Sequence, residues 1–259
     1  MCKNCGCGAS HGHHHDHAHT HSHDHSHDHD HDHSHDHDHG GGTVHRVALE
    51  RAVLDANDRL AERNRGWFAG RGIVVLNLIS SPGSGKTALL ERTLDRLAAA
   101  GIPTAVLVGD QYGELDADRL EHHGAYVKQI QVHESCHLTA EQIAAELPLL
   151  PESVRLLLIE NVGNLVCPVA FDLGEAAKVA LLSTPEGEDK PLKYPGLFAA
   201  AEMVLLTKMD LAGVLDFRHG EALRNIRRVN PDAAVLELSS KTGDGLDEWI
   251  SYLLKQVNL

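Results

Sequence analysis

Residues 73–87 read Ile-Val-Val-Leu-Asn-Leu-Ile-Ser-Ser-Pro-Gly-Ser-Gly-Lys-Thr, and this stretch decides the fold. Residues 73–79 are almost wholly apolar, which predicts a strand buried on both faces. A glycine-rich turn follows and leads into a helical pattern. A strand, a glycine-rich loop and a helix in this order predict a phosphate-binding loop, with backbone N–H groups of residues 83–87 around the phosphates. Lys86 would then reach the outer phosphates, and Thr87 would bind Mg²⁺.

Buried strands and helices alternate along the rest of the chain. Further strands are expected at residues 104–108, 126–130, 154–159, 179–182, 203–206 and 235–238, and helices at residues 86–100, 140–147, 217–229 and 245–256. Such alternation predicts an α/β fold with a doubly wound, mostly parallel sheet. Ligands of these folds bind at the carboxyl ends of the strands, so polar residues that follow a strand are candidate site residues.

Two expected strands end in residues suited to phosphate and Mg²⁺. Asp110 follows the strand at 104–108 and is a candidate to bind Mg²⁺ or to hold its water. Glu160-Asn161-Val162-Gly163 follows the strand at 154–159, and Gly163 is placed to contact a terminal phosphate as a switch. Ser80 stands where the usual phosphate-loop pattern has its first glycine, a change that leaves the loop mechanics intact.

Two later segments suit a guanine base. Thr207-Lys208-Met209-Asp210 resembles the guanine-reading element of GTPases, although Thr stands where Asn is commoner. The carboxylate of Asp210 would accept from the two donor groups of guanine and so reject adenine. Ser239-Ser240-Lys241-Thr242-Gly243 follows the last strand and resembles the loop that packs on the base.

The first 42 residues are a low-complexity segment that ends in three glycines. Sixteen of the 22 histidines lie between His11 and His39, interleaved with Asp. Since nothing apolar in this run is larger than Ala18, it cannot form a core, and we expect it to be disordered without metal. Imidazole is a common ligand of Ni, Zn and Cu, so His11 to His39 are predicted as weak storage ligands. The alternative is an engineered purification tag.

The chain has five cysteines, which a reducing compartment would keep as thiols. Cys2, Cys5 and Cys7 are spaced to close three thiolates around one Ni²⁺ or Zn²⁺. Cys136-His137 and Cys167 form a second candidate metal site, because Cys167 lies four residues beyond Gly163. Three ligands leave a tetrahedral ion one short, so water or a second subunit would complete the shell. Each of the two also has an ordinary interpretation as a buried thiol or a surface histidine.

Composition limits the classes of function. The formal net charge of -14 argues against a nucleic-acid partner, which usually requires a basic patch. No stretch is long and apolar enough for a transmembrane helix, and the polar start does not suit a secretory signal, so we expect a cytosolic protein without a membrane partner. The predicted organisation is a metal-binding tail over residues 1–42, an amphipathic helix and lead-in over 43–69, and a nucleotide domain over 70–259.

These segments together resemble the HypB family of hydrogenase nickel-incorporation GTPases, a SIMIBI-class group of P-loop NTPases. The similar segments are the Cys-x-x-Cys-Gly-Cys start, the His-rich insert, the residues at 80–87, 109–119, 136–138 and 160–168, and the Thr-Lys-Met-Asp-Leu and Ser-Ser-Lys-Thr-Gly loops. The resemblance implies a GTPase of low turnover that helps deliver Ni²⁺ to the large-subunit precursor of [NiFe]-hydrogenase, together with a HypA-like partner. It also implies a GTP-favoured homodimer with a metal at the interface.

The resemblance assigns roles to individual residues. It implies catalytic roles for Lys86, Thr87, Asp110, Glu160 and Gly163. It implies nucleotide contacts from Gly83, Ser84, Gly85, Lys86, Thr87, Ala88, Lys208, Asp210, Ser240 and Lys241. It implies Ni²⁺ ligation by Cys2, Cys5 and Cys7, and by Cys136, His137 and Cys167, the last three also suiting Zn²⁺.

Two alternatives remain open at this point. The urease accessory GTPase UreG shares the phosphate loop, but it carries a Cys-Pro-His metal motif where this chain has Cys167-Pro168-Val169. A passive nickel or zinc store with a vestigial nucleotide site would need no intact phosphate loop, and Lys86 and Asp210 argue against it.

Overall fold

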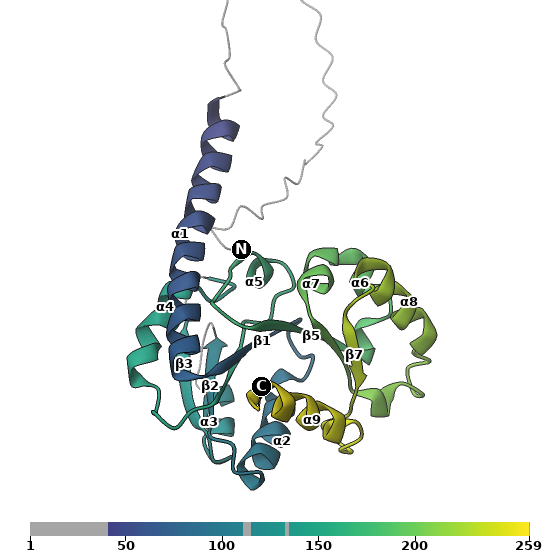
Figure 1. The fold of residues 1–259 in the computed structure, drawn as a ribbon. Coiled ribbons are helices and arrows are strands. Elements are labelled where there is room, and N and C mark those ends of the chain that lie inside the picture. The colour runs from purple at the N-terminus through teal and green to yellow at the C-terminus, as the bar shows by residue number, and fades with distance from the viewer. Residues whose placement is uncertain (1–40, 111–114, 133–134, 259) are drawn as a thin grey trace, which may run out of the picture.

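The computed structural model describes residues 41–110, 115–132 and 135–258, and the structural statements below concern these residues. They form a seven-stranded sheet with the strand order β3-β2-β4-β1-β5-β6-β7 (Figure 1). The strands are β1 (Val74–Ser80), β2 (Thr104–Asp110), β3 (Tyr126–Gln131), β4 (Leu156–Glu160), β5 (Ala177–Ser183), β6 (Met203–Thr207) and β7 (Ala234–Glu237). Every pairing between these strands is parallel. The predicted doubly wound sheet is therefore confirmed.

Helices cover both faces of the sheet. They are α1 (Gly41–Arg71), α2 (Lys86–Ala99), α3 (Leu115–Leu120), α4 (Ala140–Glu146), α5 (Cys167–Ala170), α6 (Lys190–Lys193), α7 (Pro195–Ala200), α8 (His219–Val229) and α9 (Leu246–Val257), with 3₁₀ turns at Leu147–Leu149, Thr184–Glu186 and Met209–Leu211. One apolar core joins α2 and α9 to one face of the sheet. Two others join α1 and α4, and α7 and α8, to the other face. The central strands are thus covered on both sides, which explains their almost continuous apolar sequence.

Helix α1 is longer than the sequence predicts, and its buried face is different. It begins at Gly41, among the three glycines that end the low-complexity segment, and continues through Gly70. Gly72 ends it in the left-handed region at φ 65°. In Figure 1, the N-terminal part of α1 projects away from the body of the molecule.

The helix was expected from the spacing of Val47, Leu49, Val53, Leu54 and Leu60. Of these, Leu54 and Leu60 are half-buried. Leu49 and Val53 are 67% and 49% exposed. The buried stripe consists instead of Asn57, Ala61, Asn64 and Phe68, which recur every three or four residues. The predicted helix is confirmed, but hydrophobic periodicity does not identify this stripe, because two of its members are asparagines that face the interior and bond to backbone groups.

All seven strands point the same way, so their carboxyl ends meet at one edge of the sheet. The loops after β1, β2, β4 and β6 meet there, and they carry the residues that the sequence singles out. Within the described part of the chain, none of the helices has the length and apolar character needed to cross a membrane.

Candidate functional site

The loop between β1 and α2 has the backbone shape of a phosphate cradle. Gly83 and Gly85 have φ values of 72° and 100°, a left-handed region that glycine enters without the steric cost other residues meet. Gly85 is also the N-cap of α2. The first N–H groups of a helix lack acceptors within it and, with the helix dipole, attract anions. The turn therefore presents N–H groups where the sequence predicts phosphate.

Ser80 holds the lysine of this loop. The Lys86 ammonium donates to Ser80 Oγ at 2.9 Å, and the Ser84 hydroxyl donates to the same oxygen. Both Ser80 and Lys86 are buried, and burial lowers the pKa of Lys86 although nearby Glu160 opposes the shift. The serine that replaces the usual first glycine thus supplies an acceptor that orients the lysine, a role that the sequence pattern does not reveal.

Glu160 lies across the loop from Lys86. Its Oε1 accepts a hydrogen bond of 2.8 Å from the Thr87 hydroxyl. Its Oε2 is buried and has no hydrogen-bond partner among the described residues. Burial raises the pKa of Glu160 to about 7, with Lys86 and the Thr87 hydroxyl acting in the opposite direction. A buried carboxylate oxygen without a partner, beside a threonine hydroxyl, is an arrangement that accepts a hard divalent cation.

A cavity of about 440 Å³ opens in front of these residues. Its walls come from the phosphate loop, from Asp110 at the end of β2, and from the segment 160–163 after β4. Gly163 approaches the loop closely, since a Cβ atom built on it would lie 2.9 Å from the Cα of Pro82. The segment after β4 therefore lies directly against the phosphate loop, and a side chain at position 163 would not fit.

Helix α3 adds a basic side chain to this cavity that the sequence did not single out. Arg119 and Asp116 both line the wall. The Arg119 guanidinium donates to both carboxylate oxygens of Glu91, at 2.9 and 3.0 Å, and these hydrogen bonds raise its pKa. Arg119 ends the segment 109–119, but its place on the cavity wall could not be predicted, because only the fold brings α3 to the cavity.

A second cavity, of about 270 Å³, adjoins the first and shares Gly85 and Ala88 with it. Its other walls include the residues predicted to contact the base, which are Lys208, Asp210, Ser240 and Lys241. Thr207 stands where Asn is commoner in the guanine-reading element. Its hydroxyl donates to the carbonyl of Ser84 at 2.8 Å. That bond fixes the end of β6, which lines the second cavity, to the phosphate loop, which lines the first.

Asp210 and Lys208 are held firmly in this second cavity. The Ser239 hydroxyl donates to Asp210 Oδ1 at 2.7 Å. Lys208 adopts the left-handed region at φ 58°, and its ammonium donates to the carbonyl of Gly83 at 2.7 Å. The cavity thus presents a fixed carboxylate beside the phosphate loop.

Cys136, His137 and Cys167 come together from segments 30 residues apart. One ligand atom from each lies within 4.8 Å of the other two, and all three residues are buried. The His137 ring stacks on Phe171 with centroids 3.8 Å apart, and burial lowers its pKa. A lowered pKa keeps imidazole neutral, which is the form that binds a metal. Two thiols and one neutral imidazole suit Zn²⁺ or Ni²⁺.

Asparagines connect this group to the first cavity, in front of the phosphate loop, which is called the nucleotide cavity below. Asn161 is buried, and its Oδ1 accepts from the N–H of Leu138 at 3.3 Å, one residue beyond His137. Its Nδ2 donates to Asn77 of β1 at 3.1 Å. Asn164 accepts from the N–H of Cys167 at 3.2 Å. Asn77, a single polar residue within an apolar strand, is a sequence feature that could have indicated this network.

Several predicted ligands lie outside the described residues. They are Cys2, Cys5, Cys7 and the histidines from His11 to His39. Their assignment rests on the sequence alone.

Comparisons with known proteins agree with the fold. Residues 74–237 match the family model for the CobW/HypB/UreG nucleotide-binding domain. The chain is 50% identical over 211 residues to the hydrogenase maturation factor HypB of Escherichia coli K12, covering 81% of this chain and 72% of that protein.

Two solved structures are also similar. HypB from Helicobacter pylori in complex with nickel has a TM-score of 0.75 at 38% identity, covering 78% of this chain and 95% of that one. HypB from Archaeoglobus fulgidus has a TM-score of 0.74 at 36% identity, covering 78% and 99%. The relatives from E. coli and A. fulgidus are named hydrogenase maturation factors, and the HypB of Helicobacter pylori, 38% identical over 215 residues, is named a hydrogenase/urease maturation factor. All of them are HypB proteins, which favours the HypB family over a UreG-like protein. With its P-loop nucleotide-binding domain, the chain belongs to the HypB family of hydrogenase maturation factors.

Proposed function

We propose that this protein is a GTPase that binds Ni²⁺ and delivers it during [NiFe]-hydrogenase maturation. The observation that carries the proposal is that one short segment serves both sites. Residues 160–163 line the nucleotide cavity, and Cys167, four residues later, stands in the Cys136–His137–Cys167 group. A solved relative is a complex with nickel, which supports nickel as the cargo.

The described residues suit phosphoryl transfer from GTP. Lys86 and the loop N–H groups would stabilise charge on the transferred phosphate, as in other phosphoryl transfers. Asp210 would select guanine. Thr87 and Glu160 would hold Mg²⁺, with Asp110 beside them on the cavity wall, and the Mg²⁺ would neutralise phosphate charge. No glutamine that could orient the attacking water is assignable from the sequence, so slow intrinsic hydrolysis is expected.

Partners and storage extend the proposal. The three-ligand group leaves a tetrahedral ion one ligand short, which supports completion by water or by a second copy in a GTP-favoured homodimer. A HypA-like metallochaperone and the hydrogenase large-subunit precursor would receive the nickel. Cys2, Cys5 and Cys7 would bind nickel tightly, and His11 to His39 would hold a local store of it.

We expect Ni²⁺ affinity at the Cys136–His137–Cys167 group to differ at least about fivefold between the protein bound to GDP and to a non-hydrolysable GTP analogue. The reason is the contact of Gly163 with Pro82, through which a terminal phosphate would move the segment that carries Cys167. By linkage, Ni²⁺ must change the affinity for the nucleotide by the same factor. Calorimetric titrations in both nucleotide states, with Cys167→Ala to identify this site's contribution, measure the effect. Equal affinities would contradict the coupling.

We also expect Mg²⁺ affinity in the presence of GDP to rise about tenfold between pH 6 and pH 8. Burial raises the pKa of Glu160 to about 7, so below that pH its carboxyl group is protonated and a poor ligand, whereas above it the carboxylate is free to bind. Fluorescence titration with Mg²⁺ across this range measures the rise. Glu160→Gln is the control, because it retains the titration of the phosphates but should lose this extra dependence on pH. An equally steep rise in Glu160→Gln would refute the assignment.

A further inference from the structure

Two asparagines of α1 each connect the two segments that carry the metal ligands. Asn57 Oδ1 accepts from the N–H of Ala140 at 2.9 Å, and its Nδ2 donates to the carbonyl of Asp172 at 2.7 Å. Asn64, two helical turns later, donates through Nδ2 to the carbonyls of Ala140 at 2.9 Å and Leu173 at 3.2 Å. Both side chains therefore bridge the same two stretches of backbone.

These stretches are direct continuations of the ligand segments. Ala140 lies three residues after His137, and Asp172 lies five residues after Cys167. The loop that contains Asp172 begins at Phe171, the ring on which His137 stacks. Helix α1 consequently touches the Cys136-His137 segment and the Cys167 segment through the same amide groups.

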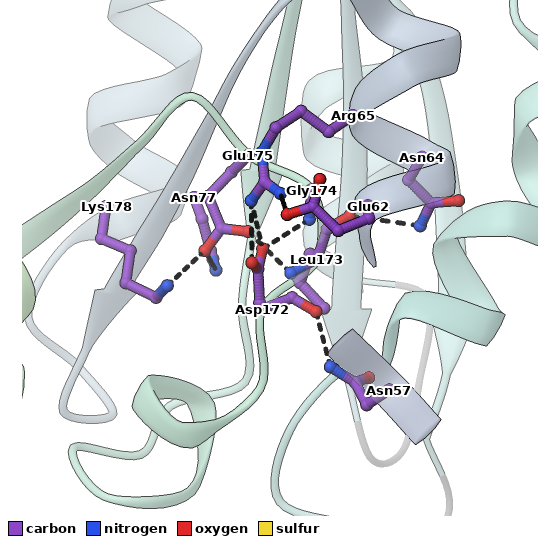
Figure 2. Close-up of polar contacts among 10 residues, drawn as sticks. All are labelled: Asn57, Glu62, Asn64, Arg65, Asn77, Asp172, Leu173, Gly174, Glu175 and Lys178. Carbon is purple, nitrogen blue, oxygen red and sulfur yellow. Dashed lines mark hydrogen bonds and ion pairs between the residues drawn. The ribbon is translucent and has the colours of Figure 1, made fainter. Parts of the chain in front are cut away.

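An ion pair and a close backbone approach reinforce the connection. Figure 2 shows Arg65 of α1 against Asp172, with hydrogen bonds of 3.0 and 2.7 Å to the two carboxylate oxygens. The same carboxylate accepts from the N–H of Gly174 at 2.8 Å. A Cβ atom on Gly174 would lie 2.7 Å from the carbonyl oxygen of Ala61, and its φ is 90°. The loop thus lies directly on the helix, and only glycine fits at the contact.

Packing alone would not require asparagine at these positions. Asn57 and Asn64 are 6% and 2% exposed, and they share the buried stripe with Ala61 and Phe68. A buried amide is costly unless its hydrogen bonds are made, so each asparagine is favourable only while both stretches of backbone stay in place. A bridge of this kind fixes the distance between the two stretches more tightly than apolar contact does.

We propose that Asn57 and Asn64 are positioning residues for the metal site, an inference that rests on the proposed binding of nickel by Cys136, His137 and Cys167. All ligand atoms must reach one ion at about 2.0–2.3 Å, so the affinity depends on the relative position of the two segments. Helix α1 sets that position through the hydrogen bonds of its two asparagines, without contributing a ligand. Because α1 follows residues 1–40 directly in the chain, it also joins the Cys- and His-rich segment to this support.

The test uses the full-length protein with Cys2, Cys5 and Cys7 changed to Ser, which serves as the parent. Only Cys136 and Cys167 are then able to give thiolate-to-metal charge-transfer absorption, because the tail histidines carry no thiolate. Ni²⁺ is titrated against a competing chelator while this absorption is followed. The double variant Asn57→Ala, Asn64→Ala is expected to bind Ni²⁺ about 10- to 100-fold more weakly, the range seen when groups that orient metal ligands are removed. Its affinity for GDP without Ni²⁺ should equal that of the parent.

Asn230→Ala is the matched control for a purely structural effect. Its side chain also donates to backbone carbonyls, those of Phe198 and Ala201 at 3.0 and 2.9 Å, in partly buried hydrogen bonds, but it ties α8 to α7 instead of the metal segments. It should be destabilised in urea and retain the Ni²⁺ affinity of the parent. If Asn230→Ala lost as much Ni²⁺ affinity as the α1 variant, the positioning role would be refuted.

The remaining outcomes separate the two proposals. Thiolate absorption in the parent with an unchanged Ni²⁺ affinity in the α1 variant refutes the positioning role alone. Absence of thiolate absorption in the parent refutes the metal assignment and the inference with it. If the double variant does not fold, Arg65→Ala replaces it, because its ion pair with Asp172 is partly exposed. That variant should weaken Ni²⁺ binding by about threefold or more, and an unchanged affinity would again refute the role.

Discussion

Lys86→Ala is expected to lower the rate of GTP hydrolysis at least about 100-fold, the usual effect of removing a group that stabilises transition-state charge. The ammonium group is buried on the wall of the nucleotide cavity, and Ser80 holds it in one position. Such a charge acts strongly because water is excluded from it and because it needs no reorganisation during the reaction. Phosphate release under single-turnover conditions, at saturating Mg²⁺ and GTP, measures the rate.

The same variant separates a GTPase from a passive metal store. Lys86 takes no part in the predicted metal sites, so Lys86→Ala should bind as much Ni²⁺ as the unmodified protein. Lys255→Ala, on the exposed face of α9, is the matched control and should hydrolyse GTP normally. Hydrolysis at the original rate in Lys86→Ala would refute the catalytic role of the phosphate loop and favour the store.

The sheet was predictable from the sequence because most of its strands are apolar runs that end in a polar or glycine-containing loop. The strands predicted at residues 73–79 and 203–206 match the observed β1 and β6 to within one residue at each end. The motifs could be placed for the same reason, since parallel strands bring their carboxyl ends to one edge. The short helices α3 and α5 carry too few residues for a periodic pattern and were not predicted.

The buried face of α1 shows what such patterns miss. Asn57 and Asn64 are polar, so hydrophobic periodicity places them on the surface. They are buried because backbone groups of two distant loops need partners there, and these loops are 76 to 115 residues away in sequence. A partner so distant leaves no trace in the local sequence. Ser80, Asn161 and Arg119 lie in segments that the sequence indicated, but their roles could not be predicted, because these roles depend on contacts that only the tertiary fold creates.

Asp210→Asn is expected to weaken GTP binding about 1,000-fold and to raise the affinity for xanthosine triphosphate, because a site built to hydrogen-bond a base rejects one that lacks the matching groups. Guanine presents two neighbouring donors, and a carboxylate accepts from both. An amide presents one acceptor and one donor, so its NH₂ group opposes a guanine donor but matches the additional carbonyl group of xanthine. Competition against a fluorescent guanine nucleotide measures GTP and xanthosine triphosphate on the same protein.

The position of Asp210 makes this substitution a clean test of base recognition. Ser239 donates to Asp210 Oδ1, and an asparagine oxygen can accept the same bond, so the loop should keep its shape. The phosphate loop lies in the adjoining cavity and is not altered. Asp232→Asn, on the exposed surface before β7, removes the same charge without touching the base cavity and should bind GTP normally. A gain for xanthosine triphosphate cannot arise from misfolding, whereas equal losses for both nucleotides would show that Asp210 supports the loop and does not read the base.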